Sequence, residues 1–266
     1  MLHLPPRPEG NVQERVQERA PARHLAACLL MGQVLLRVLQ GRFHRRNLME
    51  HLATVGPGSL RAVLMINFFA GMIFTVQTAR ELSRYGVTDA VGGAFALAFC
   101  RELAPVLTAG IVAGQVGTAF AAELGTMRVT EQIDALQMMR TDPVDYLVTP
   151  RVVATLAMLP LLTVFAIAIG IFGGTSVALL FYGQPPQAFL DSVRSFLDLR
   201  DLLAVILKSM FFALIIASVG CSFGLSTRGG ARGVGESATA AVVTIWVGIF
   251  MADFALSVLL FGTLAI

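Results

Sequence analysis

The chain has 266 residues, of which 56% are hydrophobic and only 14% are charged, and its formal net charge is +3. A soluble domain has about one quarter charged residues, so this composition excludes a large soluble protein and indicates several membrane crossings. The small basic excess does not indicate a nucleic-acid partner, because most of the arginines precede the first long apolar stretch, where membrane orientation explains them. The 3 cysteines lie far apart and the 4 histidines all lie at or before His51, so we predict no disulfide, no metal site and no histidine-dependent catalytic group in the membrane.

The N-terminal part of the chain lacks an apolar stretch long enough to span a membrane. Residues 1–23 carry prolines and charges without a signal-peptide pattern, and we expect a mobile tail. Residues 24–56 combine a short apolar run with arginines, which is typical of an amphipathic helix in the membrane interface. A soluble helix packed on another subunit is the alternative. We expect Gly56-Pro57-Gly58 to break this helix before a membrane domain of residues 57–266.

Five later stretches are long enough for a membrane span, which takes about 20 apolar residues. They cover residues 60–78, 90–124, 152–182, 202–225 and 238–264. The second would be roughly 50 Å long as a straight helix, so it must tilt, break or project, and Pro105 is a natural place for a kink. A tight loop, STRGGARGVGES at 226–237, is expected before the last span. We therefore predict an all-α polytopic membrane protein.

The basic residues predict the orientation of these spans. With the N-terminus inside, cytoplasmic segments hold 14 of the 20 Lys and Arg residues and outer segments hold five, with Arg101 left within a span. The positive-inside rule then places the N-terminus in the cytoplasm and the C-terminus outside. Small residues recur every fourth position on the second span (Ala109, Ala113, Gly117) and on the third (Ala166, Gly170, Gly174), which favours close helix packing and makes an oligomer reasonable.

Four charged residues lie within the spans and away from the span ends at Arg61 and Glu123. Arg101 and Glu102 lie about 16 Å into the second span if the helix is regular. They either line a polar cavity for a substrate headgroup or mark the outer end of a span that begins at Leu103. Lys208 and Asp253 lie at matching depths in the fourth and fifth spans, so we predict a structural salt bridge between them, with a proton relay as the alternative.

The segment between the second and third spans is polar and amphipathic. Its sequence, MRVTEQIDALQMM at 127–139, places Glu131, Gln132 and Asp134 on one face and Met127 and Leu136 on the apolar side. This pattern predicts a helix that docks on a cytoplasmic partner; a helix lying on the membrane surface is the alternative.

The sequence contains no GxxxxGK[ST] motif, so another subunit would have to hydrolyse any ATP that drives transport. We therefore expect a transport permease that is not itself an enzyme, with no catalytic residues and no cofactor of its own. An ion-coupled secondary transporter of an amphipathic substrate is the alternative, although five spans argue against a two-fold internal repeat. An intramembrane enzyme would need a nucleophile–base set or metal ligands, which the spans do not offer.

Several motifs resemble the MlaE (YrbE) family, the permease subunits of ABC transporters that work with MCE-domain lipid-binding proteins. They are RELAPVLTAGIVAG, AELGTMRVTEQIDAL, DPVDYLVTPRVVA and GGARGVGESAT, followed by a last span with Asp253. The resemblance covers about residues 50–266 and is greatest to the cyanobacterial and plastid-envelope branch, while the Ser-poor N-terminus favours a bacterial source.

The resemblance implies a homodimer in the bacterial inner membrane that moves phospholipid between membranes. It implies ATP-binding ATPase subunits docked on the segment around Glu131, Gln132 and Asp134, and a hexameric MCE ring on the outer face. Arg101 and Glu102 match the charged pair of the lipid cavity in this family, and Gln77 is expected to contact the headgroup with them. The family often has Arg where this chain has Gln115.

Overall fold

The computed structural model describes Gly32 and residues 45–261, and all regular elements within these residues are helical. The elements are α2 (Arg45–Arg84), η1 (Thr88–Ala90), α3 (Val91–Ala98), η2 (Phe99–Leu103), α4 (Ala104–Val112), η3 (Ala113–Gly117), α5 (Thr118–Val129), α6 (Gln132–Met138), η4 (Val144–Val148), α7 (Thr149–Tyr182), α8 (Pro186–Phe196), α9 (Leu199–Leu225) and α10 (Gly230–Phe261).

Five helical stretches among the described residues are long and apolar enough to cross a membrane. They are Asn47–Arg84, Thr88–Val129, Val144–Tyr182, Leu199–Leu225 and Gly230–Phe261. This confirms the predicted polytopic all-α fold with five spans. The chain is a multi-pass membrane protein.

The second span is one continuous helical rod from α3 to α5 that contains two π-helical turns, η2 and η3. Pro105 sits in the first turn of α4, directly after η2. A π-helical turn accommodates an extra residue without ending the helix, and proline is tolerated in a first helical turn. The predicted irregularity near Pro105 is therefore a π-helical turn that leaves the helix continuous.

The prediction that Gly56-Pro57-Gly58 breaks the chain is wrong, because α2 runs through all three residues as one helix of 40 residues. Pro57 removes a single N–H, whereas an interrupted helix at membrane depth would leave several backbone groups without partners. A side chain at Gly56 would meet the Met158 sulfur at 2.8 Å, so glycine lets α2 lie close to α7. The predicted boundary at 56/57 thus falls inside α2. The predicted tail (1–23), and the interfacial helix up to residue 44 except Gly32, lie outside the described residues.

The predicted loop at 226–237 is also much shorter than expected, since α10 begins at Gly230. Gly229 and Gly230 have positive φ angles of 93° and 67°, which reverse the chain within a few residues. The rest of the glycine-rich motif belongs to the helix, where a Cβ at Gly233 would collide with the Arg228 backbone.

The small-residue patterns pack helices within the protomer. On α7, Gly170 faces Phe99 and the Asn67 carbonyl, and a Cβ at Gly71 of α2 would overlap the Gly170 backbone. On the second span, Ala109, Ala113 and Gly117 are buried, and Gly117 approaches Ile245 of α10. Close approach of this kind strengthens dispersion contacts where lipid provides no hydrophobic drive.

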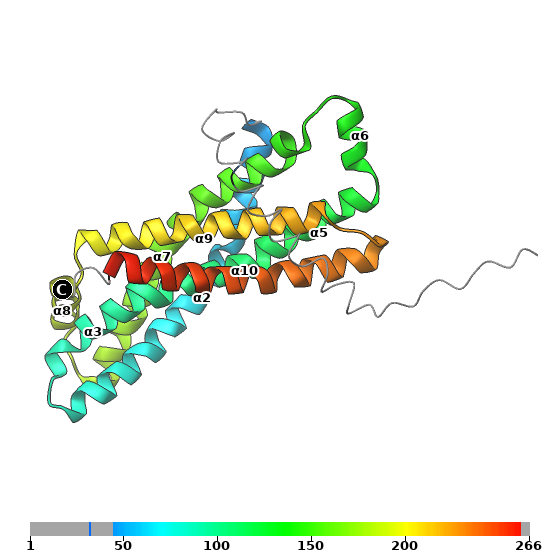
Figure 1. The fold of residues 1–266 in the computed structure, drawn as a ribbon. Coiled ribbons are helices and arrows are strands. Elements are labelled where there is room, and N and C mark those ends of the chain that lie inside the picture. The colour runs from blue at the N-terminus through cyan, green and yellow to red at the C-terminus, as the bar shows by residue number, and fades with distance from the viewer. Residues whose placement is uncertain (1–31, 33–44, 262–266) are drawn as a thin grey trace, which may run out of the picture.

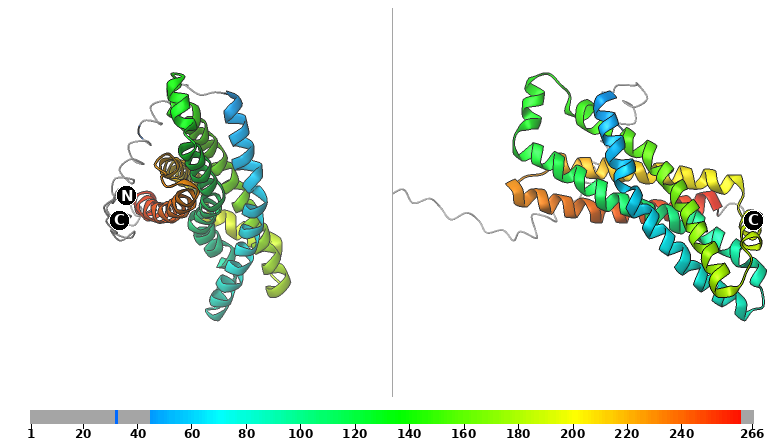
Figure 2. Two further views of the ribbon diagram at one scale, coloured as in Figure 1. Left: turned by 90° about the vertical axis from the view of Figure 1, so that its right-hand side faces the viewer. Right: turned by 180° about the vertical axis from the view of Figure 1, so that it is seen from behind.

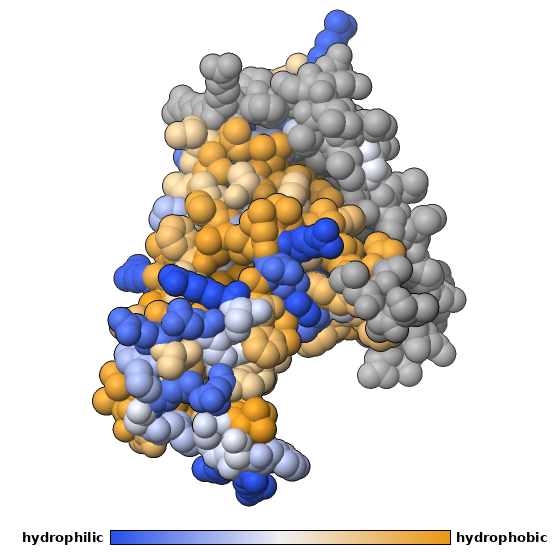
Figure 3. All heavy atoms as spheres, turned by 90° about the vertical axis from the view of Figure 1, so that its left-hand side faces the viewer, coloured by the Kyte–Doolittle hydropathy of each residue, from blue (hydrophilic) through white to orange (hydrophobic). Residues whose placement is uncertain are grey.

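The elements that connect the spans gather at two ends of the molecule (Figures 1 and 2). One end carries α6 and the turn between α9 and α10. The other carries α8, the turn between α2 and α3, and the end of α10. Figure 3 looks onto this second end, where hydrophilic residues gather over the lower part of the view beside a hydrophobic region above them. If α6 is cytoplasmic, as the sequence predicts, the α8 end is the outer end, and we use these terms below.

Candidate substrate site at the outer end

The site begins at the backbone carbonyl of Arg101, which lies in the π-helical turn η2. Pro105, just after this turn, has no N–H, so the helix has one backbone donor fewer here. Lys208 of α9 lies beside this turn, and its Nζ donates a hydrogen bond to the Arg101 oxygen at 3.2 Å. The irregular turn in the second span is therefore also the place where a charged side chain enters.

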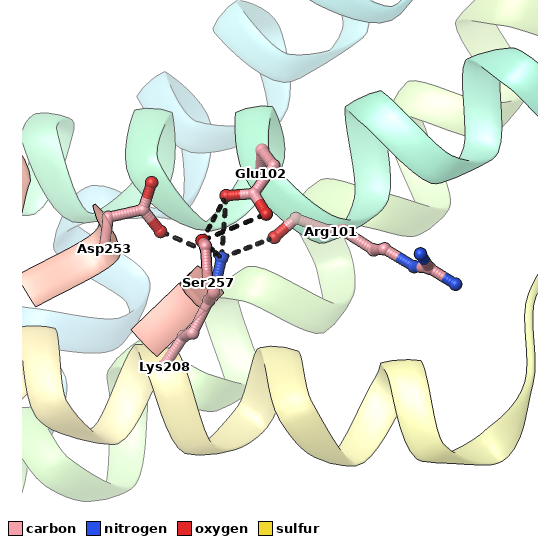
Figure 4. A network of polar contacts seen from close by, with 5 residues as sticks. All are labelled: Arg101, Glu102, Lys208, Asp253 and Ser257. Atoms are coloured by element: carbon pink, nitrogen blue, oxygen red, sulfur yellow. Dashed lines mark hydrogen bonds and ion pairs between the residues drawn. The ribbon is translucent and has the colours of Figure 1, made fainter. Parts of the chain in front are cut away.

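Lys208 is the centre of a polar network that joins η2, α9 and α10 (Figure 4). Its Nζ lies 2.7 Å from Glu102 Oε2, 2.7 Å from Ser257 Oγ and 3.0 Å from Asp253 Oδ1. The Ser257 hydroxyl also lies 3.0 and 3.1 Å from the two Glu102 carboxylate oxygens. Asp253 and Ser257 are four residues apart on α10, so they share the helix face that meets Lys208.

Burial explains why Lys208 needs so many partners. Its side chain is 0% exposed, whereas the Asp253 side chain is 16% exposed and that of Glu102 is 42% exposed. A buried ammonium is tolerated when carboxylates and hydrogen-bond acceptors replace its water shell. The Asp253 contact meets the distance of an ion pair without hydrogen-bond geometry, and its Oδ1 is buried with no hydrogen bond. The network thus has one buried cation facing two carboxylates.

Arg101 points away from this network, as Figure 4 shows. Its Nη2 lies 2.9 Å from both carboxylate oxygens of Asp201, in the first turn of α9. The guanidinium also lies over the ring of Phe261, 4.9 Å from the ring centroid, and Lys208 Nζ lies 5.4 Å from the same centroid. Arg101 and Glu102 are adjacent in sequence, yet their side chains belong to two separate charge pairs.

Two cavities flank the start of α9. One, of about 320 Å³, is lined by Arg101 and Cys100 of η2, Ile167 of α7 and apolar residues around the α8–α9 junction. The other, of about 410 Å³, lies between the start of α9 and the end of α10, with Leu260 and Phe261 in its wall. Asp201 lines both cavities. Apolar walls with a few convergent polar groups are typical of sites for small amphipathic molecules.

The structure brings Lys208 and Asp253 into contact, as their matching depths predict, but it adds partners that sequence reasoning missed. Glu102 is the closer carboxylate of Lys208, and the sequence pattern singles out neither Asp201 nor Ser257. The four-residue spacing from Asp253 to Ser257 and the proline shortly after the charged pair are the signals that point to this network. Gln77 is exposed on α2 and makes no hydrogen bond to Arg101 or Glu102 in the described part of the protomer, so its headgroup role stays a prediction.

The predicted coupling segment, residues 127–139, comprises the end of α5, a turn and α6. Glu131 precedes α6 with a positive φ of 61°, and Glu131 and Gln132 are exposed. Asp134 forms a salt bridge with Arg128 at 2.6 Å. The apolar face holds Met127 and Leu136, which pack partly buried against the core beside Ile133.

One buried arginine connects the helices on either side of this segment. Arg151, at the start of α7 and with a side chain only 6% exposed, binds Glu123 of α5 at 2.9 Å and the Leu147 carbonyl at 2.7 Å. Its guanidinium lies 5.5 Å from the ring centroid of Phe120. No motif in the sequence predicts that Arg151 connects α5 to the start of α7, on either side of α6.

Within Gly32 and residues 45–261, no group of three or more His, Cys, Asp or Glu side chains is placed to bind a metal ion.

The family "Permease MlaE" matches residues 48–259. The chain belongs to the MlaE permease family. This agrees with the motifs noted in the sequence.

Curated MlaE relatives match this chain over most of its length. It is 54% identical to "Probable ABC transporter permease protein slr1045" of Synechocystis sp. over 90% of this chain and 91% of that protein. It is 46% identical to "Protein TRIGALACTOSYLDIACYLGLYCEROL 1, chloroplastic" of Arabidopsis thaliana over 88% of this chain and 67% of that protein. It is 43% identical to "Probable ABC transporter permease protein ycf63" of Pyropia yezoensis over 88% and 89%.

The family and the names of these relatives show that this chain is an ABC transporter permease subunit. They include cyanobacterial and chloroplast proteins, in line with the branch that the GGARGVGES motif indicates. Gln115 is exposed on η3.

Proposed function

We propose that this permease moves phospholipid or a related lipid between membranes, as a homodimer that works with separate ABC ATPase subunits and an MCE-domain protein. The observation that carries the proposal is the outer charge network. Glu102 and Arg101 are partly exposed charges within an apolar span, and Arg101 lines a cavity whose walls are largely apolar. Polar groups of this kind within a membrane span are costly and are typical of a substrate path.

A lipid has the matching chemistry. Its charged or hydroxylated headgroup would contact Arg101, Glu102 and Gln77, and its acyl chains would lie along apolar walls. The name of the Arabidopsis relative contains that of a galactolipid, which supports a lipid as the substrate class. The proposed location is the bacterial inner membrane.

The proposed homodimer would cover the exposed apolar faces of α2 and α10. Ile73 on α2 and Val243, Phe250 and Phe254 on α10 have exposed fractions between 57% and 73% in the protomer. In a dimer these helices would enclose a shared cavity next to Glu102, and the remaining apolar surface would face lipid.

The proposed ATPase site is the α6 segment. Glu131 and Gln132 offer exposed polar groups, and Met138 and Met139 at the end of α6 have exposed fractions of 81% and 67%. Methionine suits a surface that must adapt to a partner. ATP would bind to that partner, and its conformational changes would reach the spans through α5 and α7.

The test is affinity purification of the chain from its native membrane, followed by an ATPase assay and lipid mass spectrometry of the eluate. The proposal predicts an ATPase, an MCE-domain protein and bound phospholipid in one complex. A complex that holds an ATPase but neither an MCE-domain protein nor any lipid would refute the lipid function and leave only the ABC permease.

A further inference from the structure

The guanidinium of Arg101 has unused hydrogen-bonding capacity. A guanidinium carries five N–H donors, yet the contact with Asp201 uses only Nη2, which lies 2.9 Å from each carboxylate oxygen. The Arg101 Nε is buried and has no hydrogen-bond partner. The side chain forms part of the wall of the 320 Å³ cavity, so an additional acceptor in that cavity would find donors ready for it.

Asp201 is held in place independently of Arg101. Its Oδ2 accepts a hydrogen bond from the backbone N–H of Asp198 at 3.0 Å, in the first turn of α9. A carboxylate near a helix N-terminus is also stabilised by the helix dipole. Asp201 would therefore stay in position if Arg101 turned to another anion.

A phosphate is the anion that fits this exchange. Arginine binds carboxylate and phosphate with the same planar set of donors, so one can replace the other without leaving the guanidinium unpaired. The cavity walls around the pair, including Ile167, Leu202 and Val205, are apolar and suit the glycerol and acyl portion of a lipid.

We propose that Asp201 is a positioning residue that competes with the phosphate of the transported lipid for Arg101. It holds the guanidinium between transport cycles and takes it back when the headgroup leaves, which limits how tightly the headgroup is held. The inference rests on the proposed lipid-transport function and adds to it the residue that promotes release.

The proposal predicts an opposite effect of Asp201 and Arg101 on lipid affinity. Asp201→Asn keeps an oxygen for the Asp198 N–H but removes the charge that competes for Arg101. We expect the apparent KM for phospholipid and the transport kcat both to fall, each about fivefold, the size expected when a charge-assisted hydrogen bond becomes a neutral one. Arg101→Ala should instead raise KM and lower the amount of phospholipid retained.

The experiment uses the native complex reconstituted with phospholipid vesicles, and it measures ATP-driven transport against lipid concentration together with retained phospholipid by mass spectrometry. The matched control is Asp191→Asn, which neutralises an exposed carboxylate of α8 that lines neither cavity, and this variant should behave as the wild type. Asp201→Glu keeps the charge and should restore the wild-type KM. Thermal unfolding of each variant in detergent shows that the fold is intact.

The outcomes distinguish a failure of the proposed lipid-transport function from a failure of the proposed competition at Arg101. A wild-type complex that shows neither phospholipid retention nor lipid transport overturns the proposed function, and with it this inference. A lipid-transporting wild type in which Asp201→Asn leaves KM unchanged, or raises it as Arg101→Ala does, overturns this inference alone.

Discussion

Each end of the molecule buries a cation, but the two cations have different sets of partners. At the inner end, Arg151 has one carboxylate partner, Glu123, with a carbonyl and an aromatic ring as further contacts. At the outer end, Lys208 faces two carboxylates and a hydroxyl, and cavities adjoin the start of α9 beside it.

This difference indicates different roles for the same residue types. The inner pair is local, since it connects α5, η4 and α7 around the base of the coupling segment. The outer network is branched, with carboxylates in excess over Lys208 and a second pair at Arg101. Arg101 and Arg151 both have a buried Nε without a hydrogen-bond partner, so unused donors do not distinguish the two ends. The outer network differs in its branching and in the cavities that adjoin it, which would let it exchange partners with a substrate.

The largest expected effect is the loss of the outer cation. Lys208→Ala would leave Glu102 and Asp253 without a counter-charge, and removing one member of a buried pair costs about 3–5 kcal/mol. Thermal unfolding in detergent should show this as a large fall in Tm. A triple variant, Lys208→Met with Glu102→Gln and Asp253→Asn, removes all three charges and should regain much of the loss. An equal fall in Tm in both variants would show that unpaired charge is not the cause of the lost stability.

The next effect is the loss of the inner cation. Arg151→Ala would leave Glu123 unpaired, but the Glu123 side chain is 52% exposed and water can solvate it. We expect a loss of about 2 kcal/mol, mainly from the Leu147 hydrogen bond and the contact with Phe120. The same unfolding assay checks this value, and a loss as large as that of Lys208→Ala would contradict the contrast between the two ends.

Matched neutral substitutions of the more exposed carboxylates sharpen the comparison. Glu102→Gln and Glu123→Gln each replace a half-exposed partner of a buried cation, so each should cost about 1 kcal/mol or less. Lipid transport should fall in Glu102→Gln, because this carboxylate borders the substrate path. If Glu123→Gln impairs headgroup binding equally, the outer network has no special role in recognition.

The smallest effect on stability is expected at Gln77. Its side chain is exposed on α2, and exposed substitutions stay within about 0.5 kcal/mol. Gln77→Ala should still raise the apparent KM for lipid if the headgroup reaches α2 of either protomer. Unchanged transport kinetics would remove Gln77 from the proposed site.

Much of the fold follows from the sequence because membrane spans depend on apolar length alone. The two errors of placement, at Gly56-Pro57-Gly58 and at 226–237, share a cause. Glycine and proline are read as chain breaks in water, but lipid penalises unpaired backbone groups, and packing against Met158 or the Arg228 backbone favours glycine within a helix.

The site was only partly predictable for a geometric reason. Depth in the membrane pairs Lys208 with Asp253, but it does not say which way Arg101 and Glu102 point around the helix. The π-helical turn η2 sets the directions in which the Arg101 and Glu102 side chains point. No residue pattern in the sequence predicts the position of such a turn uniquely. The sequence does not single out Asp201, because its position at the start of α9 becomes meaningful only when α9 packs beside η2.

The most direct test of the account measures ATP-driven phospholipid transport by the native complex carrying Arg101→Ala and Glu102→Ala together, beside the inner-end variant Glu123→Gln. The account predicts that the double variant assembles with its partners but transports little lipid, while Glu123→Gln still binds lipid normally. Normal transport by the assembled double variant would contradict the central claim that the outer charge network receives the headgroup.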